Sequence, residues 1–277
     1  MAKKINEIKE ILLGEPTEAQ LAEIQGDSRL GVQKLLQAYH KRLEKAAAER
    51  ERFQKMLDFE RGAYAEGAAY VCGVDEAGRG PLAGPLVIAA VILPQEVFIA
   101  GLNDSKQLSA TKRDKLYDEV LAKAVAISVN IVSVSNIDRL NIYRATQEGM
   151  QEAVAALEPK PEVALVDAMP IRVEGVKSLA IVHGDALSAS IAAASIVAKV
   201  TRDRLMEDLD KLYPVYGFAG HKGYGSALHM QAIREHGACQ WHRRSYEPIK
   251  SMGLAPVAEE GNIIYNPQKV KCPFELH

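Results

Sequence analysis

The spacing of apolar positions changes near residue 70. Before that point apolar residues recur at helical spacing, and from Leu36 to Leu57 they follow a three-four pattern that is broken only at Arg50. After it, short apolar runs alternate with helical segments. The pattern therefore predicts a helical N-terminal extension over 1–69, a mixed domain over 70–250 and an irregular tail over 251–277.

The mixed domain shows two kinds of periodicity. Short apolar runs predict strands, and longer stretches with apolar positions three or four apart predict helices. This order of elements indicates an α/β architecture in which helices flank a mixed five-stranded sheet. The strands are expected near 70–75, 86–93, 126–134, 163–167 and 178–182, and the helices near 111–124, 136–157, 186–212 and 226–236.

The long helix of the extension has a basic bias in its first half. Three interpretations stay open: a solvated face on a helix that packs against its neighbour, an arm that binds nucleic acid, or a dimerising helix. The basic residues are Lys34, Lys41, Arg42 and Lys45.

The composition is that of an ordinary globular protein, with 48% hydrophobic residues, 25% charged residues and a formal net charge of −2. No apolar stretch is long enough to span a bilayer, and the N-terminus lacks the apolar core of a signal peptide. Cys72, Cys239 and Cys272 form no Cys-x-x-Cys pair, which argues against a disulfide framework or a zinc site. We expect a cytoplasmic, monomeric protein that does not enter membranes.

Four carboxylates stand at or just beyond the ends of apolar runs. Asp75 and Glu76 follow 70–74, Asp167 follows 163–166, and Asp185 comes after 179–182. A carboxylate at the end of a buried strand is costly unless something pairs with it. Carboxylates without His or Cys partners select a hard cation, Mg²⁺ or Mn²⁺, over zinc. The sequence therefore predicts a site for one or two divalent ions.

Three of the four carboxylates, Asp75, Glu76 and Asp185, also have a simpler explanation. Neighbours on a regular strand point to opposite faces, so Asp75 and Glu76 can serve one site only if the strand ends or bulges at Glu76. Otherwise Glu76 faces solvent. Asp185 precedes a helical segment and is a candidate N-cap.

Two glycine-rich segments offer bare backbone to a ligand. In Gly78-Arg79-Gly80 the arginine can reach a phosphate, although a mere tight turn explains the glycines equally. Over 217–225, glycine, basic and aromatic residues interleave, as expected where a sugar or base stacks beside a phosphate. The run 241–246 repeats this theme or forms a surface basic strip.

The stretch from Gly73 to Pro85, Gly-Val-Asp-Glu-Ala-Gly-Arg-Gly-Pro-Leu-Ala-Gly-Pro, closely resembles the signature of type 2 ribonucleases H, specifically ribonuclease HII. The resemblance covers about residues 70–250, and its motifs are long and ordered. Arg79 and the helical N-terminus favour ribonuclease HII over ribonuclease HIII. Further matches lie at 102–106, 166–168, 184–186, 190–203, 221–225 and 242–246.

The resemblance implies a ribonuclease H-like fold and a metal-dependent endonuclease. Its substrates would be RNA–DNA hybrids and duplex DNA with embedded ribonucleotides, incised on their 5′ side to leave 3′-hydroxyl and 5′-phosphate ends. It makes Asp75, Glu76, Asp167 and Asp185 the metal-binding catalytic set.

The resemblance also implies a substrate-recognition set. Gly78, Arg79 and Gly80 resemble the loop that senses the ribose 2′-hydroxyl, the group that distinguishes RNA from DNA. Tyr224 resembles the tyrosine that stacks on the neighbouring deoxyribose. Candidates for phosphate contact are Lys106, Lys199 and Lys222.

Two rival functions stay open at this point. One is a two-metal nuclease of the same fold that cuts DNA, and the other is a catalytically silent nucleic-acid-binding module. Protein partners cannot be read from the sequence.

Overall fold

The computed structural model describes residues 3–273, which divide between Gln54 and Lys55 into two compact units. Residues 1–2 of the predicted extension and 274–277 of the predicted tail lie outside the described part. The first unit holds α1 (Ile5–Leu13), α2 (Glu18–Gln25) and nearly all of α3 (Leu30–Lys55). The long helix is confirmed, but it starts before Leu36 and ends before Leu57.

Helix caps and a small apolar cluster hold the first unit together. Thr17 accepts a hydrogen bond from the Gln20 amide, and the Gln20 side chain accepts one from the Thr17 amide, which forms a capping box at α2. Arg42 donates to the carbonyls of Leu12 and Gly14 at the C-terminal end of α1. One member of the basic group therefore stabilises the unit itself. The buried cluster comprises Ile8, Leu12, Ile24, Val32 and Leu36.

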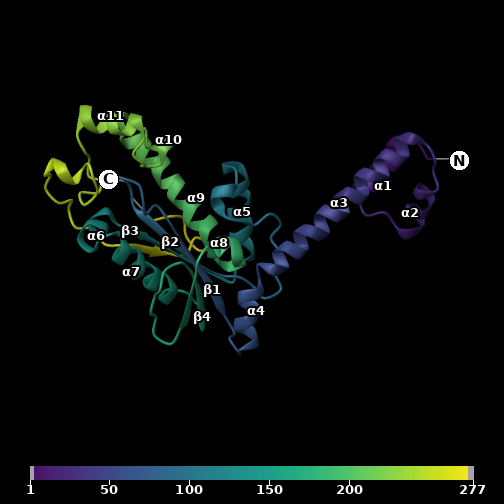
Figure 1. The fold of residues 1–277 in the computed structure, drawn as a ribbon, viewed down its shortest axis with the longest axis horizontal. Coiled ribbons are helices and arrows are strands. Elements are labelled where there is room, and N and C mark those ends of the chain that lie inside the picture. Colours follow the sequence, from purple (N-terminus) through teal and green to yellow (C-terminus); the bar gives the residue numbers. More distant parts are fainter. Residues whose placement is uncertain (1–2, 274–277) are drawn as a thin grey trace. The chain divides into compact units, whose positions relative to one another are not determined.

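The second unit is an α/β domain built on a mixed sheet (Figure 1). Its strands are β1 (Val71–Ala77), β2 (Leu86–Ile92), β3 (Ala126–Val132), β4 (Val163–Asp167), β5 (Lys177–Ile181) and β6 (Ile263–Tyr265). They lie in the order β5-β4-β1-β2-β3-β6. The pairs β1–β4 and β4–β5 are parallel, and the others are antiparallel.

The helices of this unit follow the same chain order. They are α4 (Asp58–Ala65), α5 (Ala110–Lys123), α6 (Val134–Leu140), α7 (Ile142–Ala155), α8 (Gly184–Leu187), α9 (Ala189–Leu212), α10 (Phe218–His221) and α11 (Ala227–His236). Short 3-10 turns lie at η1 (Ser105–Gln107), η2 (Pro214–Tyr216) and η3 (Lys250–Met252). Within residues 3–273, no helix is both long and apolar enough to cross a membrane.

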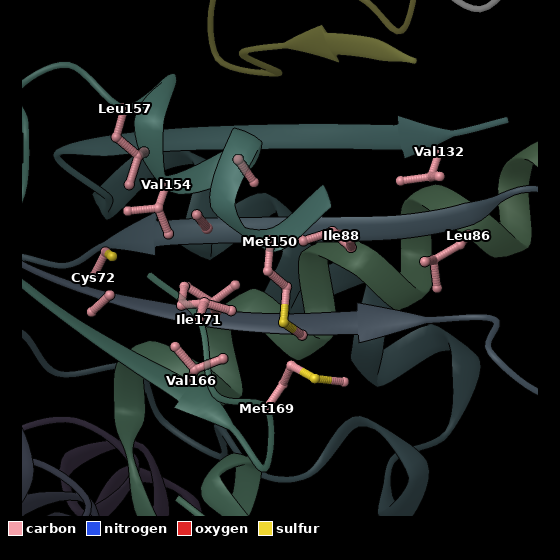
Figure 2. Packing of buried hydrophobic residues seen from close by; sticks show 14 of the residues in the cluster. Cys72, Leu86, Ile88, Val132, Met150, Val154, Leu157, Val166, Met169 and Ile171 are labelled. Atoms are coloured by element: carbon pink, nitrogen blue, oxygen red, sulfur yellow. The ribbon is translucent and has the colours of Figure 1, made fainter. Parts of the chain in front are cut away.

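Helices cover both faces of the sheet. On one face Met150 and Val154 of α7 pack over the strands that carry Ile88 and Cys72 (Figure 2). On the other face α9 lies so close to β1 that a Cβ on Gly73 would stand 2.0 Å from the Ser190 carbonyl carbon. Small residues therefore let the α9 backbone touch the central strand, as the alanine-rich sequence of this helix suggests.

Three expectations about these elements are corrected. The predicted helix 136–157 is two helices, because Asn141 adopts a φ of 67° and its side chain caps α7. The predicted helix 186–212 breaks at Ser188, whose hydroxyl caps α9. The sheet has a sixth strand, β6, inside the tail expected to be irregular. That strand is three residues long, too short for an alternating pattern to reveal it.

Candidate active site

Asp75 and Asp167 lie at the same level on neighbouring parallel strands. The register pairs Val74 with Val166, so the two aspartates come next along β1 and β4. Side chains alternate along a strand, so Asp75 shares the face of Gly73, which α9 covers. Leu165 packs with Ile191 of α9, which puts Asp167 on the same face. The fold therefore brings these two carboxylates together beneath α9.

Glu76 does not lie at a strand end or at a bulge, the condition under which it would share a face with Asp75. The antiparallel register with β2 runs unbroken from Cys72 to Ala77, so the strand neither ends nor bulges at Glu76. By alternation its Cβ starts on the other face from Asp75. The pairing of β1 with β4 stops at Val74, however, so Glu76 lies past the end of the paired part of these two strands. It is only partly exposed and stays within electrostatic reach of Asp167.

Asp185 reaches the same place through a tight connection. The Gly184 amide donates to Asp167 Oδ1 at 2.8 Å, which ties the start of α8 to the end of β4. Asp185 follows in the first turn of α8 and is buried, and the N-cap position is taken by His183, so the alternative interpretation of Asp185 as an N-cap is wrong. Ala168 and His183, on either side of this connection, both adopt left-handed backbone (φ 50° and 58°). Such strain in non-glycine residues is typical of functional sites.

Burial and neighbouring carboxylates raise the pKa of Asp75, Glu76 and Asp185. Burial lifts the pKa of Asp75 well above its ordinary value, and the charges of Glu76 and Asp167 add to the effect. Burial also raises the pKa of Glu76, with Arg79 opposing the shift and Asp167 adding to it. For Asp185, burial, Asp104 and Asp167 raise the pKa. A cluster of this kind favours a cation, because clustered negative charge is costly without one.

The donor chemistry fits a hard divalent ion, since every candidate ligand is a carboxylate oxygen. The side chains do not form a ready cage, however. Within residues 3–273, no three His, Cys, Asp or Glu side chains stand so that they could hold an ion without moving. The Cβ of Glu76 lies on the opposite face of β1 from that of Asp75, which is consistent with the absence of a ready metal cage. We therefore regard the group as an oxygen donor set that requires side-chain adjustment to coordinate a metal.

Several residues around the carboxylates were not predicted as site residues. Ser195 of α9 hydrogen-bonds to Asp75, and its hydroxyl lies 2.9 Å from that of Ser105. Asp104 caps η1 and acts on the pKa of Asp185. The available signal was Asp104 itself, a further acidic residue inside one of the matched motifs.

Of the three predicted lysines, Lys106 faces the carboxylates. Its Nζ lies 3.9 Å from Asp185 Oδ2, and its side chain is 77% exposed. Lys199 donates to Asp203 at 2.6 Å along α9, and Lys222 donates to Glu207 at 2.7 Å. These two ammonium groups are therefore engaged in local ion pairs.

The two predicted recognition segments lie against each other. A Cβ on Gly80 would stand 3.5 Å from Tyr224 Cε1, so the glycine backbone faces the tyrosine ring. Tyr224 is half exposed, and Arg79 approaches Glu76 with an Nη1–Oε1 distance of 3.5 Å. The loop 78–80 is thus placed between Glu76 and Tyr224.

Glu60 of α4 is another residue that the sequence analysis missed. It is 2% exposed, and its Oε1 accepts hydrogen bonds from the Ser188 hydroxyl at 2.7 Å and the Ser190 amide at 2.9 Å. The carboxylate therefore holds the N-terminal end of α9, three residues after Asp185.

Family models and curated relatives match most of the chain. A family model described as Ribonuclease HII matches residues 72–248, and one described as Ribonuclease HII N-terminal domain matches residues 4–64. The chain is 51% identical over 226 residues to ribonuclease HII of Bacillus cereus, covering 82% of this chain and 88% of that protein. The identity and the two coverages are the same for ribonuclease HII of Bacillus anthracis.

Solved structures confirm the ribonuclease H-like fold. Ribonuclease H2 from Pyrococcus horikoshii OT3 is 29% identical with a TM-score of 0.59, covering 66% of this chain and 96% of that chain. The RNase HII of Archaeoglobus fulgidus, solved in a complex with PCNA, is 28% identical with a TM-score of 0.55, covering 64% and 95%. The chain therefore belongs to the ribonuclease HII family, whose members are endoribonucleases that cleave RNA in RNA–DNA hybrids.

Proposed function

We propose that this chain is a divalent-metal-dependent endonuclease that cleaves RNA in RNA–DNA hybrids and also incises 5′ to single ribonucleotides embedded in duplex DNA. The observation that supports it best is the placement of Asp75 and Asp167 at one level and on one face of neighbouring parallel strands. The bond from the Gly184 amide to Asp167 adds Asp185 to the pair.

Asp75, Glu76, Asp167 and Asp185 would hold one or two Mn²⁺ or Mg²⁺ ions. A bound ion supplies positive charge that activates a water and stabilises the leaving 3′-oxygen, so that cleavage yields 3′-hydroxyl and 5′-phosphate ends. Lys106, close to Asp185 and largely exposed, is suited to contact a phosphate beside the cut. Lys199 and Lys222 would need to leave Asp203 and Glu207 to do so.

Gly78, Arg79, Gly80 and Tyr224 would recognise the junction between RNA and DNA. Bare backbone at the glycines can approach a 2′-hydroxyl closely, and the half-exposed ring of Tyr224 can stack on the next sugar. We further propose that residues 70–250 form the catalytic domain and that the chain acts as a monomer in the cytoplasm.

Cleavage of three matched duplexes tests the proposal: a continuous RNA–DNA hybrid, DNA with one ribonucleotide, and all-DNA, each with Mg²⁺, Mn²⁺ or a chelator. We expect cutting of the first two only, dependent on metal, with a 3′-hydroxyl on the upstream fragment and a 5′-phosphate on the ribonucleotide that begins the downstream fragment. Cutting of all-DNA would support the DNA nuclease instead. The absence of cutting on every duplex would support the silent binding module.

Asp75→Asn tests the metal site directly. We expect turnover to fall by about three orders of magnitude, because a ligand of the catalytic ions is lost. The fold should persist, which fluorescence of Trp241, the single tryptophan, can report. Asp208→Asn, at a half-exposed carboxylate on α9, is the matched control. Turnover of Asp75→Asn close to that of this control would exclude the proposed site.

A further inference from the structure

Two buried arginines lie beneath the loop that carries Arg79. Arg202 of α9 is 1% exposed, and Arg243, in the segment after α11, is 0% exposed. Within the described residues neither guanidinium has a carboxylate partner within hydrogen-bond reach; Arg243 also contacts the Tyr246 hydroxyl at 3.2 Å. A buried cation without an anion is costly, so compensation must come from elsewhere.

That compensation is a set of main-chain carbonyls. The two guanidinium groups donate seven hydrogen bonds to backbone carbonyls, and all seven acceptors belong to residues 78–85 or to Lys222, which directly precedes Gly223. Arginine suits this task because its planar fork offers five donors in fixed directions, whereas lysine offers one point charge. The bonds are Arg202 to Pro85 O (3.1 Å), Ala83 O (3.1 Å) and Lys222 O (2.9 Å), and Arg243 to Gly78 O (2.6 Å), Arg79 O (2.9 Å) and Gly84 O (3.1 and 2.9 Å).

The glycines of the loop make this approach possible. Gly78 has a φ of 101°, and a Cβ there would stand 2.0 Å from Arg202 Nε. Gly84 has a φ of 88°, and a Cβ there would stand 2.4 Å from Met206 Sδ and 3.3 Å from Arg202 Nη2. These two glycines therefore face inward, toward the arginine, whereas Gly80 faces Tyr224.

Tyr246, which is partly exposed, also supports the loop backbone through its hydroxyl. Its hydroxyl donates to Arg79 O at 2.6 Å and accepts from Arg243 Nη1 at 3.2 Å. The carbonyl of Arg79 thus receives two hydrogen bonds from below, one from Tyr246 and one from Arg243, which fixes the peptide plane between Arg79 and Gly80.

We propose that Arg202 and Arg243 are positioning residues for junction recognition. Arg243 fixes the position and direction of the Gly78–Gly80 backbone through the Gly78 and Arg79 carbonyls. Arg202 packs against Gly78 and, through the Ala83, Pro85 and Lys222 carbonyls, aligns this loop with the segment that bears Tyr224. The inference rests on the proposed role of these two segments in sensing the ribonucleotide, and it adds the groups that hold them in register. Burial and the neighbouring charge of Arg243 lower the pKa of Arg202 to about 9, and burial also lowers the pKa of Arg243.

Arg243→Lys and Arg202→Lys in the full chain test the proposal, with Arg204→Lys, at a half-exposed arginine on the same helix, as the control. The readout is the ratio of kcat/KM on DNA with one ribonucleotide to kcat/KM on a continuous hybrid. Partial unfolding lowers both values equally and leaves the ratio unchanged. We expect the ratio to fall by about tenfold in the two variants, as misplacement of recognition groups predicts, and to stay constant in the control.

A ratio within twofold of wild type in both folded variants would overturn the inference. If the lysine variants do not fold, Tyr246→Phe decides, because it removes only the hydroxyl that supports the Arg79 carbonyl: a lower ratio supports the inference and an unchanged ratio rejects it. Failure of the proposed function is read separately, from wild-type enzyme that shows no cutting at a single ribonucleotide; the inference then fails with it.

Discussion

The contact between Glu60 and the start of α9 leads to a prediction about stability. Glu60→Ala removes the acceptor for the Ser188 hydroxyl and the Ser190 amide, both of which are buried. A hydrogen bond to a charged group contributes about 1.5–3 kcal/mol, and an unsatisfied buried donor is itself costly. Against this stands the relief of a buried carboxylate whose Oε2 has no hydrogen-bond partner among the described residues. We expect a net loss of about 2–4 kcal/mol in the free energy of unfolding.

Two further variants sharpen the measurement. Glu60→Gln keeps the Oε1 acceptor but places an amide group where Oε2 is buried, so a smaller loss of about 1–2 kcal/mol is expected. Glu66→Ala removes an exposed carboxylate of the same segment that pairs with Lys177, and it should leave the unfolding midpoint unchanged.

Urea unfolding followed by tryptophan fluorescence is the assay. Trp241 is the single tryptophan, it is buried, and it belongs to the second unit, so the signal reports on that unit alone. A free energy of unfolding for Glu60→Ala within about 0.5 kcal/mol of wild type would refute the reasoning, because surface substitutions usually change the free energy of unfolding by no more than that. It would mean that Ser188 and Ser190 find other partners at no cost.

Three other outcomes follow from the structure. Gly73→Ala should cost more than about 3 kcal/mol or prevent folding, since its Cβ would meet the α9 backbone at 2.0 Å, whereas Gly62→Ala, with open space around it, should be neutral or stabilising by urea unfolding. Burial lowers the pKa of His242 to about 3, so stability present above the unfolded pKa of about 6.5 should be lost as pH falls, by about 2 kcal/mol at pH 5. An equal drop between pH 7.5 and pH 5 in wild type and His242→Gln would contradict that assignment. Duplex binding should weaken steeply with salt because phosphate contacts release counterions, and a flat salt titration would argue against an electrostatic interface.

The strands β1 to β5 were predictable because each is a short apolar run with a clear end. The run 163–167 matches β4 at both ends, and the others differ by one or two residues. The helix breaks at Asn141 and Ser188 were not predicted, because a polar residue within a helical pattern does not show whether it caps a new helix or faces water. The left-handed backbone of Ala168 was equally hidden, since alanine does not signal a positive φ, and the weak preference of histidine for this region does not mark His183 in particular.

The convergence of the carboxylates was predictable where it follows from strand ends. Asp75, Asp167 and Asp185 are brought together by strand register and by the connection into α8, features that apolar runs indicate. Glu60 and Arg243 could not be found in this way. Their roles depend on contacts across 130 and 165 positions of sequence, and a lone charged residue carries no mark of its distant partner.

The short strand β6 has a consequence for any shortened version of this protein. All seven residues of β3 are buried, and β6 pairs with its outer border at Val129–Ile131. A chain that stopped after the motif at 242–246 would leave this apolar border bare, an open template onto which another copy could add a strand. The opposite border, β5, has mostly exposed side chains, including Lys177, which discourage such pairing. Aggregation of a shortened chain would therefore report an uncovered sheet edge, and it would not indicate damage to the arrangement of the four carboxylates.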